Sequence, residues 1–145
     1  MTLSAMRIVP LWVGAVWWGS LTTLGFFVVP MLFMHLPSPA MAGAMAAKLF
    51  SAQTAASVVC GLLLLMLFRS NRAVAPVDVA QSATLFVVGG VLLALLAEFG
   101  VSPRIIARDN LALWHRAGTA MYVVQWICAG VVFGKLAKSR TSSVS

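Results

Sequence analysis

Four long apolar segments constrain this chain more than any other feature of its sequence. They run over residues 11–34, 44–68, 80–101 and 111–137, and each can cross about 30 Å of hydrocarbon, which takes about 20 helical residues. Because lipid offers no hydrogen-bond partners, a span of this length satisfies its backbone groups only as a helix. The sequence therefore predicts an all-α integral membrane protein, folded as an up-and-down bundle of four transmembrane helices.

The composition agrees with a membrane environment. Only 9% of the 145 residues are charged and 61% are hydrophobic, whereas a soluble domain carries about 25% charged residues. The first apolar segment is far longer than the core of a signal peptide, about 7–15 residues, so we expect it to remain as a membrane helix. We predict a single transmembrane domain over residues 1–145, with a disordered polar tail at residues 139–145.

The basic residues predict the orientation rather than a nucleic-acid partner. They are spread over the termini and loops of a chain with a formal charge of +7, as topology signals and lipid-headgroup contacts are. The side that holds both termini carries six of them and the other side four, which favours cytoplasmic termini and an inner bacterial membrane. The first group is Arg7, Arg69, Arg72, Lys135, Lys138 and Arg140, and the second is Lys48, Arg104, Arg108 and Arg116.

Rows of small residues predict which helix faces meet, because close packing replaces the hydrophobic effect between helices in lipid. Lys48 lies on the row of the second span and Glu98 ends the row of the third. We therefore expect both side chains to point into the bundle at a similar depth and to pair with each other. The rows are Ala40, Ala44, Lys48, Ala52, Ala56 and Cys60, and Ala83, Val87, Gly90, Ala94 and Glu98.

Polar residues gather in the predicted non-cytoplasmic half. A polar stripe on the last span runs from His115 through Tyr122 to Gln125. Ionisable groups inside a span are costly, so their presence calls for a role. Three roles are open: a structural polar cluster that fixes helix register, a metal or haem site, and a transport or proton-relay site built around Glu98. The cluster consists of His35, Lys48, Gln53, Glu98, His115 and Arg116.

The metal alternative rests on the two histidines and the methionines near them. Imidazole and thioether ligands suit Cu(I), and two imidazoles can also ligate haem. Methionine is equally an ordinary apolar residue in a membrane helix. The candidate ligands for copper or haem are His35, His115, Met31, Met34, Met41 and Met45.

The run PMLFMHLPSPAMAGAMAAKLF, residues 30–50, resembles the signature of the transmembrane protein 205-like family, whose small bacterial members carry a domain of unknown function. That pattern has P-x-L-F, a leucine-proline turn, an Ala-Gly pair and a closing L-F, and the family histidine before the last helix is matched by His115 in LWHRAG. The resemblance implies a four-helix membrane fold and no known reaction. The matched positions are Pro30, Leu32, Phe33, Leu36, Pro37, Ala42, Gly43, Leu49 and Phe50.

We find no nucleophile–base motif, P-loop, HExxH or glycine-rich nucleotide fingerprint. The sequence therefore favours a non-enzymatic accessory or structural membrane protein. Its expected partners are the lipid bilayer and either further copies of itself or a larger membrane complex. Copper or haem binding and a small oligomeric transporter that uses Glu98 remain the alternatives.

Overall fold

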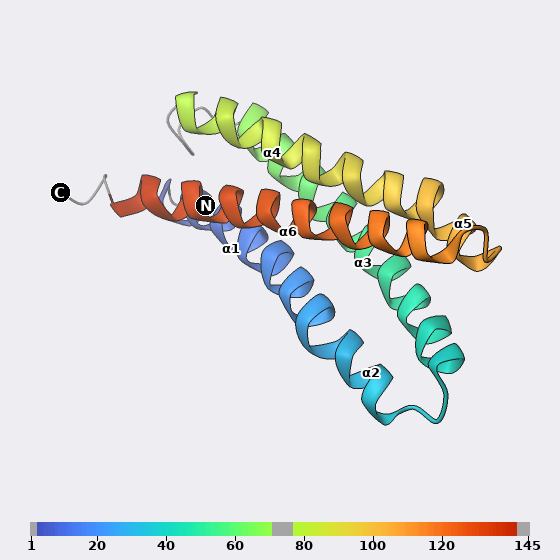
Figure 1. Cartoon of the computed structure of the whole chain (residues 1–145). Coiled ribbons are helices and arrows are strands. Elements are labelled where there is room, and N and C mark those ends of the chain that lie inside the picture. The colour runs from blue at the N-terminus through green and yellow to red at the C-terminus, as the bar shows by residue number, and fades with distance from the viewer. Residues whose placement is uncertain (1–2, 71–76, 142–145) are drawn as a thin grey trace.

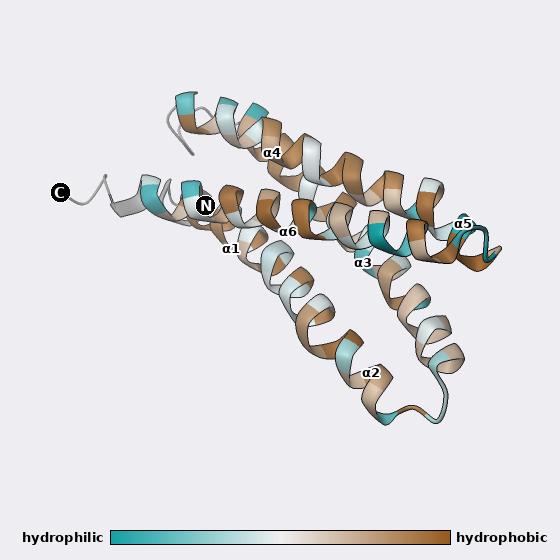
Figure 2. Ribbon diagram, viewed as in Figure 1, coloured by the Kyte–Doolittle hydropathy of each residue, from teal (hydrophilic) through white to brown (hydrophobic). Residues whose placement is uncertain are grey.

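The structure, a computed structural model, describes residues 3–70 and 77–141, and every regular element within these two ranges is a helix. Four helical stretches are long and apolar enough to cross a membrane: Ile8–His35, Pro39–Arg69, Asp78–Ile106 and Leu111–Ser139. Figure 2 shows apolar residues along the middle of these stretches and hydrophilic residues toward their ends. The predicted all-α membrane fold is confirmed.

The chain runs up and down through these stretches, and each packs on two others. The α1 stretch packs on α3 and α6, and the α4 stretch also packs on α3 and α6 (Figure 1). Two of the stretches contain a short π-helical segment between two α-helices. The elements are α1 (Leu3–Thr23), η1 (Leu24–Val28), α2 (Val29–His35), α3 (Pro39–Ser70), α4 (Val77–Leu96), η2 (Ala97–Val101), α5 (Ser102–Ile106) and α6 (Leu111–Thr141).

The helices are longer than the sequence predicts. Pro10 lies buried inside α1, which begins at Leu3. Membrane helices tolerate an internal proline because neighbouring groups satisfy the freed backbone. Residues 139–141, which were assigned to a disordered tail, belong to α6. Outside the described residues lie the rest of that tail, the loop of residues 71–76 that contains Arg72, and the side chains of Arg7 and Arg140.

Pro30 and Pro103 each lie two residues after a π-helical segment. A proline ring inside an α-helix clashes with the carbonyl four residues earlier, and a widened turn gives that carbonyl more room. Each of these prolines thus follows a π-helical turn inside a continuous helical stretch. In the widened turns the amide of Val29 donates to the carbonyl of Leu24, and the amide of Ser102 donates to that of Ala97.

The best-packed core lies in the half of the molecule that holds the chain ends. Trp17 packs so closely on Gly90 that a Cβ there would lie 2.9 Å from the indole ring. The Trp17 indole N–H has no hydrogen-bond partner among the described residues. The predicted row on α4 is confirmed, since Ala83, Val87, Gly90 and Ala94 are all buried. The largest side chains of this core that are fully buried are Trp17, Leu21, Leu64, Val87 and Val132.

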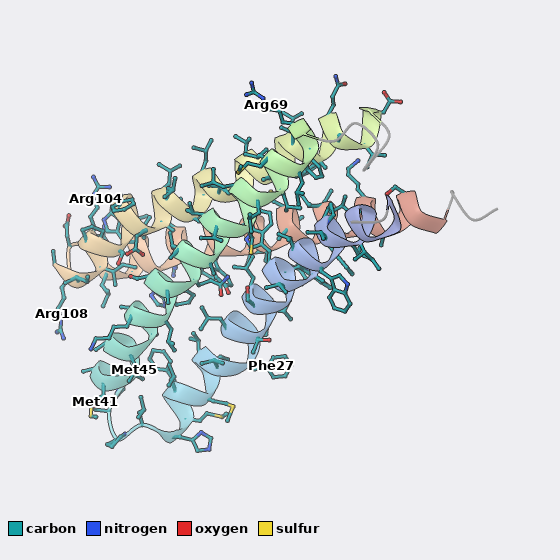
Figure 3. All side chains as sticks on the ribbon, turned by 180° about the vertical axis from the view of Figure 1, so that it is seen from behind. Phe27, Met41, Met45, Arg69, Arg104 and Arg108 are labelled. Carbon is teal, nitrogen blue, oxygen red and sulfur yellow. The ribbon has the colours of Figure 1, made fainter. Side chains whose placement is uncertain are left out.

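The opposite half of the molecule is splayed. There α2 and the start of α3, which we call the first hairpin, diverge from α5 and the start of α6, the second hairpin (Figure 1). Met41 and Met45 lie near the tip of the first hairpin, whereas Arg104 and Arg108 lie on the second (Figure 3). This divergence leaves room for a cavity between the hairpins.

Candidate functional site

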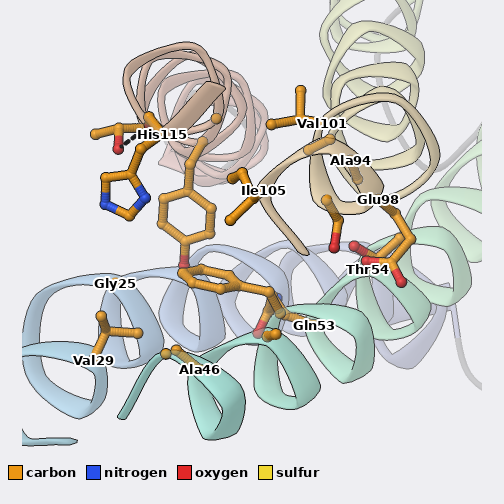
Figure 4. A pocket seen from close by; sticks show the side chains of 18 of the residues that line it. Gly25, Val29, Ala46, Gln53, Thr54, Ala94, Glu98, Val101, Ile105 and His115 are labelled. Atoms are coloured by element: carbon orange, nitrogen blue, oxygen red, sulfur yellow. Dashed lines mark hydrogen bonds between the residues drawn. The ribbon is translucent and has the colours of Figure 1, made fainter. Parts of the chain in front are cut away.

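A cavity of about 370 Å³ lies between the two hairpins. The first hairpin, with η1, contributes Val29, Phe33 and Phe50, and the second, with η2, contributes Val101 and Ile105. These side chains make most of the wall apolar. Figure 4 shows Glu98 and His115 on opposite sides of the space, with Gln53 beneath it. The cavity therefore combines an apolar body with a few polar groups, as small-molecule sites commonly do.

Glu98 gives the cavity its carboxylate. It lies in η2, is half-buried, and accepts a hydrogen bond of 2.6 Å from the hydroxyl of Ser51 on α3. The hydroxyl–carboxylate bond is short because a charged acceptor strengthens it. Ser51 was not among the predicted site residues, although it lies on the same helix as Gln53 and two positions before it.

Buried hydrogen bonds between helices form the floor of the cavity. Gln53, 9% exposed, donates to the hydroxyl of Ser20 on α1 at 2.9 Å. Gln125, 4% exposed, donates to the hydroxyl of Ser57 on α3 at 3.0 Å. Because buried polar groups are costly without partners, these two bonds fix how α1, α3 and α6 are rotated against one another.

Tyr122 closes the floor on the α6 side. Its hydroxyl donates to the carbonyl of Leu21 at 2.7 Å, and its ring meets Phe50 edge-on, with centroids 5.3 Å apart. The ring lies against Gly25, where a Cβ would be only 2.5 Å from it. The polar stripe of the last span therefore faces the cavity, where His115, Gly118, Tyr122 and Gln125 all line it.

The predicted ion pair between Lys48 and Glu98 is wrong. Lys48 is exposed and does not line the cavity, and Glu98 accepts from Ser51 instead. The reason is the rotation of α3: its two buried polar side chains, Gln53 and Ser57, turn a different row inward. Much of the predicted row, including Ala40, Ala44, Lys48 and Ala52, is exposed. The buried row is Ala42, Ala46, Gln53, Ser57, Cys60 and Leu64.

The two histidines lie on different hairpins. His35 ends α2, is exposed, and its Nδ1 makes a 3.0 Å hydrogen bond with the carbonyl of Met31. His115 is near the start of α6 and lines the cavity. Among the described residues, no group of three or more His, Cys, Asp or Glu side chains could hold a metal ion. The four methionines proposed as ligands, Met31, Met34, Met41 and Met45, are exposed.

The predicted polar cluster is therefore divided. Gln53, Glu98 and His115 line the cavity, whereas His35, Lys48 and Arg116 are exposed outside it. Sequence reasoning missed further polar lining residues, Thr54, Ser102 and Thr119. Small hydroxyl residues are common in packed membrane helices, so only the helix rotations could have distinguished these three from the rest.

Comparison with known proteins identifies a family whose function is unknown. Residues 12–113, more than half of the chain, match a family described as Domain of unknown function (DUF4149). No match was found among curated proteins or among solved structures. The matched range includes most of the first helical stretch and all of the second and third. It ends before His115, so the polar stripe of α6 lies beyond it.

Proposed function

Because this chain belongs to the DUF4149 family of unknown function, we propose its role from the site: it is a non-enzymatic membrane protein that binds an amphipathic small molecule between its two hairpins. The observation that carries the proposal is the cavity of about 370 Å³ with apolar walls. Its volume falls in the range of small-molecule sites, about 300–1,000 Å³.

The rim of the cavity supports entry from the bilayer. Phe33 and Ile106 both line the cavity, yet 49% and 71% of their surfaces are exposed. Both lie near the ends of their spans, where exposed apolar side chains suit the interface between lipid tails and headgroups. This position supports entry of an amphipathic ligand from that interface.

The metal-binding and transporter hypotheses fit the geometry of the cavity less well. A copper or haem site needs His35 and His115 side by side, and they lie on different hairpins. A small oligomeric transporter is the second candidate, favoured by the position of Glu98 in the cavity wall. It differs from a binding protein by requiring a transmembrane flux that Glu98→Gln abolishes.

Family kinship and placement complete the proposal. The motif from Pro30 to Phe50 supports a relation to the transmembrane protein 205-like family. Three residues of this motif line the cavity: Phe33, Gly43 and Phe50. The bias of basic residues supports an inner bacterial membrane with both termini in the cytoplasm. A homo-oligomer or a larger membrane complex remains the proposed assembly.

A cavity-filling variant tests the binding role. Ala47 lines the cavity, so Ala47→Phe should fill it, whereas Ala52→Phe adds the same ring to an exposed position of α3 outside it. The measurement is equilibrium dialysis of radiolabelled neopentylbenzene, a neutral probe, into protein-containing lipid nanodiscs against protein-free ones. We expect saturable uptake in the wild type and in Ala52→Phe, and its loss in Ala47→Phe. Equal uptake by protein-containing and protein-free nanodiscs, for this probe and for charged probes of the same size, would refute the proposed function.

A further inference from the structure

We propose that the cavity selects amphiphiles with a single positive charge, whose cationic group lies against the carboxylate of Glu98. This inference rests on the proposed function, since it names the class of molecule that the cavity binds. It follows from the distribution of charge around the cavity, the partners of Glu98, and the apolar surface facing it.

The cavity is the acidic place in a basic protein. The chain has three acidic residues against ten Lys and Arg. Asp78 and Asp109 are exposed near the ends of helical stretches, so Glu98 is the acidic residue that lines the cavity. No lysine or arginine is among the lining residues, and the other titratable groups there are His115 and Tyr122. Among carboxylate, lysine and arginine side chains, a carboxylate alone therefore lines the cavity.

Glu98 lacks a cation within the described part of the protein. Its hydrogen-bond partner is the Ser51 hydroxyl, which lies 2.6 Å from Oε1. A carboxylate can accept about four hydrogen bonds, so most of its capacity is unused. A half-buried carboxylate without a counter-charge attracts a cation more strongly than one in bulk water does, because the surrounding apolar groups screen its charge less. A cationic ligand would supply the charge that Lys48, exposed on the same helix as Ser51, does not.

The rest of the cavity suits an apolar body rather than a second charge. Ile105 lies across from Glu98 (Figure 4), and the edge-on pair of Phe50 and Tyr122 also lines the cavity. Aromatic rings accept alkyl groups and also attract ammonium groups through their faces. The hydroxyl of Tyr122 is committed to the Leu21 carbonyl, so it leaves an apolar ring toward the ligand.

Three probes that share a benzyl group and differ in charge test the selectivity. Benzyltrimethylammonium is cationic, neopentylbenzene is its neutral isostere, and phenylmethanesulfonate is an anion of similar size. Binding is measured by equilibrium dialysis with nanodiscs of zwitterionic lipid, corrected for protein-free nanodiscs. We expect the protein to bind the cation about tenfold more tightly than the neutral probe, and to bind the anion least.

Three substitutions test whether the preference arises in the cavity. Glu98→Gln keeps the shape of the side chain and an acceptor for Ser51, and should reduce the preference for the cation to about one while neopentylbenzene still binds. Asp109→Asn removes the same charge from an exposed turn outside the cavity and should leave the preference intact. Glu98→Asp, which restores the charge, should retain part of it.

The outcomes separate the two proposals. Equal binding of the cation and the neutral probe, or a preference that survives Glu98→Gln, would overturn the charge selectivity and leave the binding role standing. Absence of saturable binding for all three probes would overturn the binding role and the selectivity with it. Loss of neopentylbenzene binding in Glu98→Gln would show that the substitution disturbs the cavity, and Glu98→Asp then decides the selectivity.

Discussion

At the scale of single residues, Gly25 and Tyr122 show how a membrane helix makes room for a polar ring. The hydroxyl of Tyr122 reaches the carbonyl of Leu21 because its ring lies directly on the Cα of Gly25. A side chain at position 25 would displace the ring and break a partly buried hydrogen bond. Since Tyr122 and Gln125 occupy the same face of α6, such a displacement would also change the floor of the cavity.

Gly25→Ala should therefore destabilise the protein by about 1–3 kcal/mol, the usual cost of overpacking. The measurement is the free energy of unfolding in detergent. Gly89→Ala is the matched control, because nothing lies within 4 Å of a Cβ at that position of α4. It should be neutral or stabilising by up to about 1 kcal/mol through helix propensity. An unchanged free energy of unfolding in Gly25→Ala would mean that the ring can move at no cost.

At the scale of elements, the two proline-associated π turns place the side chains of the cavity. Glu98 lies inside η2 and Gly25 inside η1. A π turn inserts one residue into the helical repeat, so it rotates the residues on one side of it by about 100° relative to the other. The lining residues of both hairpins thus depend on turns that the pattern of apolar residues does not reveal.

Pro103→Ala should allow η2 to return to α-helical geometry and turn Glu98 away from the cavity. We expect the preference for benzyltrimethylammonium over neopentylbenzene to fall toward one, while the unfolding temperature stays equal or rises because alanine favours helix. Pro37→Ala, in the turn between α2 and α3, should leave the preference unchanged. A full preference in Pro103→Ala would indicate that the π turn does not depend on the proline.

The contrast between α3 and α4 explains what the sequence could predict. On α4 one row of small residues stands among large apolar ones, so its buried face is unambiguous and was predicted correctly. On α3 most residues from Ala40 to Ala56 are small, and two rows compete. The choice is made by Gln53 and Ser57, whose partners on α1 and α6 are distant in the chain. The number of spans and the fold follow from local composition. The rotation of each helix depends on those long-range hydrogen bonds, and so does whether Lys48 is buried or exposed.

At the scale of the whole molecule, long helical stretches and the splayed half belong together. Stretches of 28 to 31 residues are about 42–47 Å long at 1.5 Å per residue, well above the 30 Å of a hydrocarbon core. Helices that exceed the bilayer thickness tilt. Tilting the two hairpins in different directions keeps the packed core at one end and opens the cavity at the other.

The orientation of this asymmetric bundle is testable by labelling. Asp109 lies in the turn before α6, and Asp78 lies near the start of α4, at the opposite end of the bundle; both are exposed. With both termini in the cytoplasm, Asp109→Cys should react with a membrane-impermeant maleimide in intact cells, and Asp78→Cys only after permeabilisation. The unmodified protein is the control, because Cys60 and Cys128 lie within the spans. Labelling of Asp78→Cys alone in intact cells would reverse the orientation.

The divergence of the two hairpins also gives the protein a wedge-shaped outline. In a bilayer, the leaflet around the hairpin tips must yield more area to the protein than the leaflet around the chain ends. The lipids beside the tips are pushed apart, and those beside the compact end are not, so the protein favours a surface that bends with the tips on its convex side. Filling the cavity from Ala47 leaves this outline intact, whereas drawing the hairpins together around a bound molecule would narrow it. Ligand binding and membrane curvature would then influence each other through one and the same angle.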